Sequence, residues 1–262
     1  MSQWIVSNVP SWLLLTVLVI GTAGGTVAVL VYIRRRYPGL SAGTHNEIAK
    51  VGFSVVGPVY GFLTGFIIVV LWGQIGAADD VVRAEGSSAV QMARELEGFT
   101  KADGDRMRQS LLDYEHAAVA EWPHAARGQA TPEAEAALRR LYTTYQGVQP
   151  ADDKQRNALS SSLDSLKQLS TSRTDRLLMA RTNTGPPWSL WAVIFLTSGL
   201  VLGFAVILGE TQVRMHYVTV AATGALVAVI VFLLTELAHP FFGEMSTSPE
   251  PLRAAIEVLE SH

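Results

Sequence analysis

The chain has 262 residues, of which 49% are hydrophobic and only 16% are charged. Soluble domains usually carry about 25% charged residues, so the charge deficit makes a wholly soluble globule doubtful. A net charge of −3 offers no basic surface for nucleic acid. The absence of cysteine excludes disulfide scaffolds, thiolate metal sites and thiol nucleophiles.

Long uncharged stretches predict four membrane-spanning helices. About 20 apolar residues in a helix cross the hydrocarbon of a bilayer, and we expect spans at residues 12–33, 51–72, 188–208 and 217–237. Tryptophan and tyrosine stand near the span ends, as is typical of the membrane interface; they are Trp4, Trp12, Tyr32, Trp72, Trp188, Trp191 and Tyr217. Buried helices of a large soluble core are the disfavoured alternative.

Residues 74–187 predict an all-helical, water-soluble domain, because their apolar residues recur at helical spacing. The first helix continues from the second span without a break. The second runs from about Asp105 and stops at Pro123, and the third begins at Thr131. The fourth ends before the break at residues 183–187. No strand pattern competes with these helices.

The predicted order of parts is a transmembrane pair, the helical domain, a second transmembrane pair and a tail, at residues 1–73, 74–187, 188–238 and 239–262. The tail contains a short amphipathic helix with Leu252, Ile256 and Leu259 on one face. This helix can lie on a lipid surface or dock on a subunit, and we favour docking.

The side of the membrane on which the helical domain lies is open. Four spans place both termini and the helical domain on one side and two short loops on the other. The short loops carry Arg34, Arg35, Arg36, Lys50 and Arg214. The positive-inside rule makes that side cytoplasmic, but basic residues also follow the spans on the opposite side. We expect a multi-pass protein of the plasma membrane with its orientation undecided.

Motifs for catalysis are absent: there is no HExxH, GxSxG, phosphate-binding loop or complete EF-hand loop. Asp103, Gly104 and Asp105 resemble part of a calcium loop, but a helix N-cap is the stronger interpretation. The acid nearest to a span is Glu236, at the end of the fourth. We therefore expect no enzyme, no metal site, no cofactor and no intramembrane proton relay.

The second span carries two ridges of different character. Gly57, Gly61 and Gly65 fall four residues apart and form a smooth ridge on which another helix can approach closely. Pro58, Phe62 and Phe66 form the adjoining ridge, turned by about 100°. The phenylalanine rings can face lipid, a neighbouring helix or a pore, and spacing alone leaves these alternatives open.

The second span also resembles that of a known family. Phe62, Leu63, Thr64, Gly65 and Phe66, followed by an apolar run to Trp72, are similar to the second-helix signature of bestrophins. The order of parts matches as well, and Pro240, Phe241, Phe242, Gly243 and Glu244 follow the last span as a Pro-Phe-x-Gly element. The closer resemblance is to the bestrophin-like proteins of bacteria. It rests on Arg35 to Pro38, His45 and Asn46, Val59 to Gly61, and Tyr114 to Glu121 with Trp122 and Pro123.

This resemblance implies an all-α membrane protein with the bestrophin-like fold, whose second helices line the pore of a pentameric ion channel. Phe62 and Phe66 would form the pore neck, with Pro58 one turn earlier. Pro58 departs from the bulky aliphatic residue that the family leads us to expect. The post-span turn would be made by Pro240, Phe241 and Gly243.

Two family properties do not transfer directly. Calcium-activated bestrophins follow the Pro-Phe-x-Gly element with a run of acidic residues, whereas this chain has a single carboxylate, Glu244, in the segment that ends at Ser248. A calcium switch of that type is therefore not expected. The family also places its helical domain in the cytoplasm, against the argument from the three arginines.

The leading hypothesis is a homo-oligomeric ion channel that lies in the lipid bilayer and passes small inorganic ions through a hydrophobic phenylalanine neck. The alternative is a non-conducting membrane scaffold that assembles with a partner. Neither hypothesis involves nucleic acid.

Overall fold

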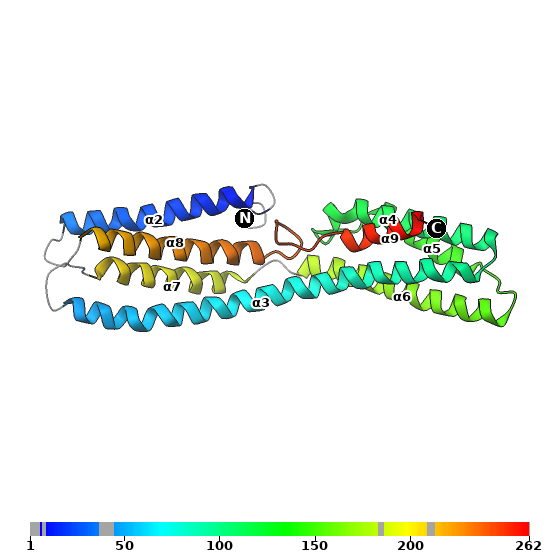
Figure 1. Cartoon of the computed structure of the whole chain (residues 1–262), viewed down its shortest axis with the longest axis horizontal. Coiled ribbons are helices and arrows are strands. Elements are labelled where there is room, and N and C mark those ends of the chain that lie inside the picture. The colour runs from blue at the N-terminus through cyan, green and yellow to red at the C-terminus, as the bar shows by residue number, and fades with distance from the viewer. Residues whose placement is uncertain (1–5, 7–8, 37–44, 183–185, 209–212, 262) are drawn as a thin grey trace. The chain divides into compact units, whose positions relative to one another are not determined.

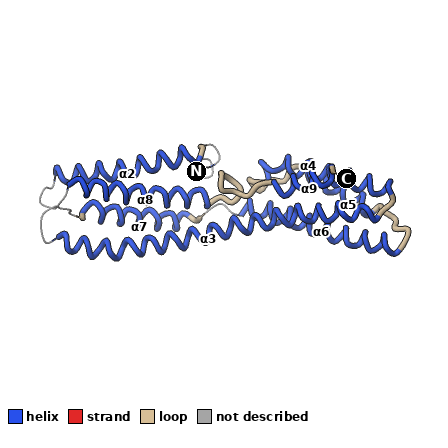
Figure 2. Tube along the Cα trace, viewed as in Figure 1, coloured by secondary structure: helices blue, strands red, loops and turns tan. Residues whose placement is uncertain are grey.

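A computed structural model describes residues 6, 9–36, 45–182, 186–208 and 213–261, and within these ranges the secondary structure is helical, with no strand (Figures 1 and 2). The helices are α2 (Ser11–Arg36), α3 (His45–Glu95), the short 3₁₀ helix η2 (Leu96–Gly98), α4 (Lys101–Ala125), α5 (Pro132–Gln146), α6 (Asp153–Thr182), α7 (Trp188–Ile207), α8 (Val213–Leu237) and α9 (Glu250–Glu260). The expected all-α class is confirmed.

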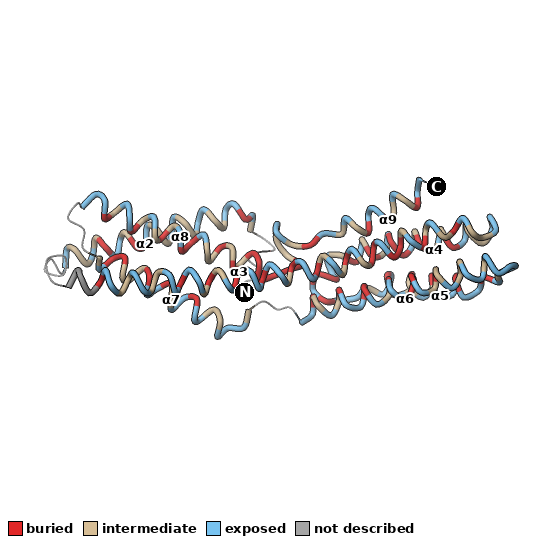
Figure 3. The backbone as a smooth tube through the Cα atoms, turned by 60° about the horizontal axis from the view of Figure 1, so that its bottom comes forward, coloured by how far each residue is buried: buried red, intermediate tan, exposed pale blue. Residues whose placement is uncertain are grey.

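The chain divides into two compact units. We call residues 1–73 and 185–245 the apolar unit, and residues 74–184 and 246–262 the polar unit. Each unit is therefore built from two separate stretches of sequence. Buried positions alternate with exposed ones along the helices of both units (Figure 3).

Among the described residues, four helices are long and apolar enough to cross a membrane: α2, α3, α7 and α8. The α2 and α3 helices extend past the expected spans at both ends and α8 begins before its span, whereas α7 ends one residue before the expected residue 208. The α2 helix continues through the three arginines to Arg36, and α8 begins at Val213, four residues before Tyr217. A helix continues past the hydrocarbon because long charged side chains reach the water at the interface. Hydropathy therefore marks only the apolar part of each helix.

Helices of the apolar unit approach one another closely at glycines. At Gly224 of α8, an added Cβ would lie 2.9 Å from the backbone of Ala23 in α2. At Gly52 of α3, it would lie 2.4 Å from the ring of Phe204 in α7. A small residue at a helix crossing thus leaves room for the backbone of the neighbouring helix at Gly224 and for a neighbouring aromatic ring at Gly52, as in many membrane helix pairs.

The α3 helix is a single helix of 51 residues with Pro58 in its interior. It confirms that the first helix of the polar segment continues from the second span without interruption. Proline removes one backbone hydrogen bond from a helix, a defect that membrane helices tolerate where neighbouring groups compensate.

The polar unit has a hydrophobic core to which α3, α4, α5, α6 and α9 all contribute. Met92, Leu111 and Leu166 are among its fully buried side chains. From α9, Leu252 and Leu259 enter the same core. The amphipathic tail helix therefore docks within its own chain.

Local signals set most helix ends of the polar unit. The α5 helix begins as predicted, because the Thr131 hydroxyl accepts a hydrogen bond from the Ala134 amide (3.4 Å). The α4 helix begins four residues before the expected Asp105, with Thr100 as its N-cap. Asp103 thus lies in the first turn and is not the cap itself. The expected stop at Pro123 was wrong by two residues, since α4 ends at Ala125. Proline lacks one backbone N–H donor, but the amides of the following residues continue the helical hydrogen bonding.

Candidate functional site

One face of α3 holds the helix on the rest of the apolar unit. Tyr60, Thr64, Ile67 and Leu71 are buried along this face. Tyr60 packs with Val201 of α7 and Val227 of α8. Its hydroxyl accepts a hydrogen bond from Ser198 Oγ (3.2 Å). This buried face was not singled out by the sequence, since it carries neither glycines nor phenylalanines at a fixed spacing.

The phenylalanine ridge lies on the opposite side of the helix. A rotation of about 100° per residue turns Phe62 by about 200° from Tyr60. Phe62 is 79% exposed and Phe66 is 63% exposed, and Pro58 is also exposed. These three residues share a surface that points away from the helices of their own chain.

The glycine ridge lies between the buried face and the phenylalanine ridge. No described atom outside the helix's own backbone comes within 4 Å of a Cβ placed at Gly57, Gly61 or Gly65. The ridge is therefore not used to pack the described helices of this chain. Its smooth surface is available to something outside the chain.

The exposed surface of α3 in the apolar unit has no ionisable side chain between Lys50 and Asp79. It consists of aromatic, aliphatic and glycine residues, one proline and one serine, Ser54. Such a surface can form a hydrophobic constriction, which gates by wetting and dewetting and needs no fixed charge. The described part of the chain contains no cluster of three or more histidine and carboxylate side chains that could hold a metal ion.

The post-span turn is fixed by one glycine. Gly243 has φ +97°, and a Cβ there would lie 2.7 Å from Val6 Cγ1 and 2.8 Å from Glu236 Oε2. Only glycine adopts this backbone readily. Glu236 accepts a hydrogen bond from Ser11 Oγ (3.0 Å), so the end of α8 is held to the start of α2. Pro240 and Phe241, in the segment between Glu236 and Gly243, are buried.

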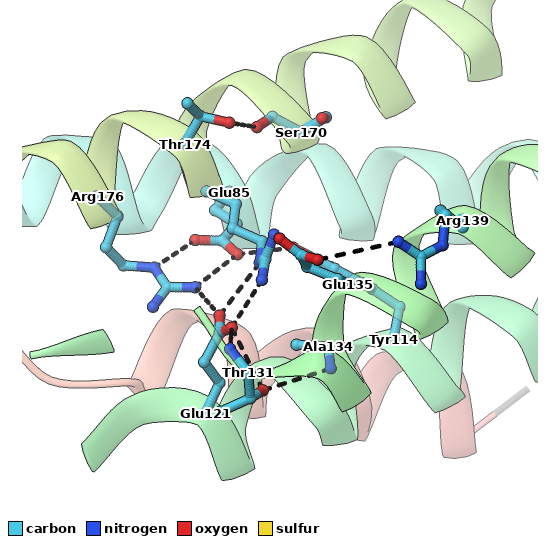
Figure 4. A network of polar contacts seen from close by, with 11 residues as sticks. Glu85, Tyr114, Glu121, Thr131, Ala134, Glu135, Arg139, Ser170, Thr174 and Arg176 are labelled. Atoms are coloured by element: carbon cyan, nitrogen blue, oxygen red, sulfur yellow. Dashed lines mark hydrogen bonds and ion pairs between the residues drawn. The ribbon is translucent and has the colours of Figure 1, made fainter. Parts of the chain in front are cut away.

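A buried charge network, missed by the sequence reasoning, lies in the polar unit (Figure 4). Arg176 of α6 binds both carboxylate oxygens of Glu85 in α3, at 2.8 and 3.1 Å. The Tyr114 hydroxyl of α4 donates to the same carboxylate (2.8 Å). The Arg176 guanidinium also lies 5.3 Å from the centre of the Trp122 ring. Three helices thus meet at one buried cation.

Glu121 of α4 forms the second half of the network. It accepts two hydrogen bonds from Arg173 (2.6 and 3.1 Å) and one from the backbone amide of Thr131 (2.8 Å). It also lies 3.7 Å from Arg176. Buried ion pairs are favourable only when further hydrogen bonds satisfy the charges. The Tyr114 hydroxyl and the Thr131 amide supply such bonds to the two carboxylates, whereas Arg176 Nη1 has no hydrogen-bond partner among the described residues. Tyr114, Glu121 and Trp122 are among the residues that carry the family resemblance, and their spacing was the one available signal.

Glu115 of α4 is a buried carboxyl group that takes no part in these hydrogen bonds. It is fully buried, and neither of its carboxylate oxygens has a hydrogen-bond partner among the described residues. Burial, and then the negative charge of Glu85, raise the pKa of Glu115 well above its usual range, while Arg176 acts in the opposite direction. The side chain is therefore held as a neutral carboxylic acid.

We expect Glu115→Gln to stabilise the polar unit at pH 8 and to change little near pH 4.5. Above the usual glutamate pKa of about 4.3, the unfolded chain ionises Glu115 while the folded chain keeps its proton, so stability falls by up to about 1.4 kcal/mol per pH unit until the folded pKa is reached. Glutamine is neutral at all these pH values and removes this loss. Thermal unfolding of the purified chain in detergent at the two pH values measures the difference.

Asp164→Asn is the matched control, because Asp164 is exposed on α6. It should leave the pH dependence unchanged. Equal pH profiles for wild type and Glu115→Gln would contradict the assignment of a neutral Glu115.

Comparison with known proteins agrees with the all-helical fold of the chain. A family model described as the Bestrophin-like domain matches residues 20–252. A crystal structure of a bacterial bestrophin homologue from Klebsiella pneumoniae, carrying a point mutation, is similar with a TM-score of 0.70. It is 12% identical and the match covers 95% of this chain and 99% of that chain, so the likeness concerns the fold. No curated protein sequence matches significantly. The chain belongs to the Bestrophin-like family and shares the all-helical fold of a bacterial bestrophin homologue.

Proposed function

We propose that this chain forms a homo-oligomeric ion channel in the plasma membrane, with α3 lining the pore and Phe62 and Phe66 forming its neck. The observation that carries the proposal is the distribution of contacts around α3. One face is buried against α7 and α8, and the opposite face exposes large aromatic rings without any charge.

A ring of subunits accounts for the exposed faces of α3. If the Tyr60 face points outward to the subunit's own helices, the phenylalanine ridge points to the axis. The two flanks then meet neighbouring subunits. The glycine ridge lies about 100° to one side, and Val59 and Val70, both exposed, lie on the other side. Contact between two different flanks is the head-to-tail type that closes into rings, and family resemblance favours five subunits.

The neck would select ions although the neck itself carries no fixed charge. Phenylalanine rings present a positive edge and a negative face, so their orientation around the axis sets the local field. Small ions must also lose part of their hydration to pass a hydrophobic constriction. Pro58 would lie one turn from Phe62, on the same ridge, where its ring narrows the entrance less than a bulky aliphatic side chain.

We expect the purified wild-type protein to conduct in planar bilayers, and Phe62→Ala with Phe66→Ala to raise the single-channel conductance or the open probability. Removing two rings per subunit widens the constriction and lowers its barrier to wetting. The control is Phe195→Ala, because Phe195 is also an exposed phenylalanine of the apolar unit but lies on α7.

Wild-type and variant bilayers that both stay silent over a range of voltages and ions would overturn the channel proposal. An intact but silent oligomer would favour the alternative, a non-conducting membrane scaffold. An effect of Phe195→Ala as large as that of the double variant would refute the assignment of the neck to α3.

A further inference from the structure

A long apolar groove lies between α2 and α7 in the apolar unit, with a volume of about 460 Å³. Its walls carry Gly21 and Gly25 on α2, and Gly199 and Gly203 on α7. Apart from the backbone of the glycine's own helix, no described atom comes within 4 Å of a Cβ placed at any of these four glycines. The groove is thus formed by missing side chains on both walls.

The shape of the groove suits a hydrocarbon chain. On α2 its lining extends from Gly21 to Ile33, which corresponds to about 18 Å at 1.5 Å per residue. The Thr26 hydroxyl of the lining donates a hydrogen bond to the Thr22 carbonyl of its own helix (2.6 Å), so it needs no acceptor on a ligand. Water in such an apolar space would lack hydrogen-bond partners, and an empty space would lose dispersion contacts with its lining.

One end of the groove is strongly basic. The lining ends at Ile33 on α2 and Ile207 on α7, and Arg34, Arg35 and Arg36 follow directly on α2. Exposed Arg214 stands at the start of α8, the helix that packs antiparallel to α2. Residues 34–50 and 208–214 contain five arginines and lysines against two acids, Glu47 and Glu210.

Arg34 is held in place at this end. Its Nη2 donates to His216 Nδ1 (2.6 Å), and the other ring nitrogen of His216 lies 3.2 Å from the Ala205 carbonyl. Because Nδ1 accepts, Nε2 carries the proton and donates to that carbonyl. The Arg34 guanidinium also stacks over the Tyr217 ring, at 5.4 Å from its centre. We call Arg34, Arg35, Arg36 and Arg214 the basic cluster. The contacts of Arg34 hold this cluster beside the groove.

We propose that the groove binds one acyl chain of an anionic phospholipid whose phosphate headgroup is held by the basic cluster at its end. The apolar space accounts for the chain, and the excess of positive charge accounts for the choice of an anionic over a zwitterionic headgroup. The proposal depends on the membrane placement of α2 and α7 and does not depend on ion conduction.

The test is to reconstitute the full-length protein in nanodiscs of equal parts phosphatidylglycerol and phosphatidylcholine, and to count retained lipids by native mass spectrometry. The wild type should retain phosphatidylglycerol in preference to phosphatidylcholine. Gly25→Leu and Gly203→Leu fill the groove and should each abolish the tightly retained lipid. Gly24→Leu is the matched control, because Gly24 has equally open surroundings but lies outside the groove.

The headgroup contact is tested separately with Arg35→Gln and Arg214→Gln. Each should weaken phosphatidylglycerol retention by about fivefold, as expected for one basic residue near an anionic headgroup. The pair Arg94→Gln and Arg127→Gln, exposed in the polar unit, should have no effect.

Three results would overturn the proposal. Equal lipid retention in Gly25→Leu and Gly24→Leu would show that the groove is not the site. Equal retention of both lipids by the wild type would remove the headgroup contact. Loss of the oligomer in Gly25→Leu without loss of lipid would show that a helix of a second copy fills the groove. All three are read without measuring current, so they are distinct from a failure of the channel proposal.

Discussion

Replacing Arg176 with methionine is expected to destabilise the polar unit by about 3–5 kcal/mol. The guanidinium is fully buried and binds both oxygens of Glu85 while also lying near Glu121. Methionine has a similar length but no charge, so Glu85 would remain buried with only the Tyr114 hydroxyl as a donor. Urea unfolding of the full chain in detergent, followed by hydrogen exchange of α4 and α6 amides, reports on this unit alone.

Two further variants test whether the effect comes from the buried network. Arg139→Met removes an arginine whose side chain is 73% exposed and pairs with Glu135 at 3.8 Å, so it should cost at most about 1 kcal/mol. Arg176→Met combined with Glu85→Gln removes both charges and should recover part of the loss, because Glu121 keeps Arg173. A single variant as stable as Arg139→Met would contradict the role assigned to the network.

We expect Gly86→Val to detach α9 from the rest of the polar unit. A Cβ at Gly86 would lie 2.4 Å from the carbonyl oxygen of Pro251 and 2.7 Å from its carbon, and a backbone group cannot move aside as a side chain can. Detachment exposes Leu252 and Leu259, each of which contributes about 1.5–3 kcal/mol when buried. Amide hydrogen exchange over residues 250–260 should rise strongly in Gly86→Val.

The same substitution at Gly76 is the matched control. Gly76 lies on the same helix, and no described atom beyond that helix's own backbone approaches within 4 Å of its Cβ. Both variants replace a helical glycine by the same β-branched residue, so propensity cancels between them. Slow exchange in α9 of Gly86→Val, equal to that of Gly76→Val, would mean that the close approach at Pro251 does not hold the helix.

The sequence was sufficient for features that depend on local pattern. Uncharged runs predicted the four apolar helices, and Thr131 before Pro132 predicted the start of α5. The ridges of the second span were visible because i, i+4 spacing is a property of one helix. Which ridge faces the chain's own helices was not visible, because it depends on Ser198, 138 residues away from Tyr60.

The buried network was hidden for the same reason. Arg176 and Glu85 are 91 residues apart, and Arg173 and Glu121 are 52 apart. Each of these side chains alone resembles an ordinary surface charge on a polar helix. The basic end of the groove could be expected from the three arginines that follow the first span, but the groove itself depends on where α7 packs beside α2.

The docking of α9 also orders events during synthesis. The core of the polar unit includes Leu252 and Leu259, whereas its other contributors precede residue 184. Between them lie α7 and α8, which must enter the bilayer first if the chain is inserted as it emerges from the ribosome. The apolar surface that α9 covers on the helices α3 to α6 therefore stays exposed while the last spans insert. The core of the polar unit is complete only after α9 has been made.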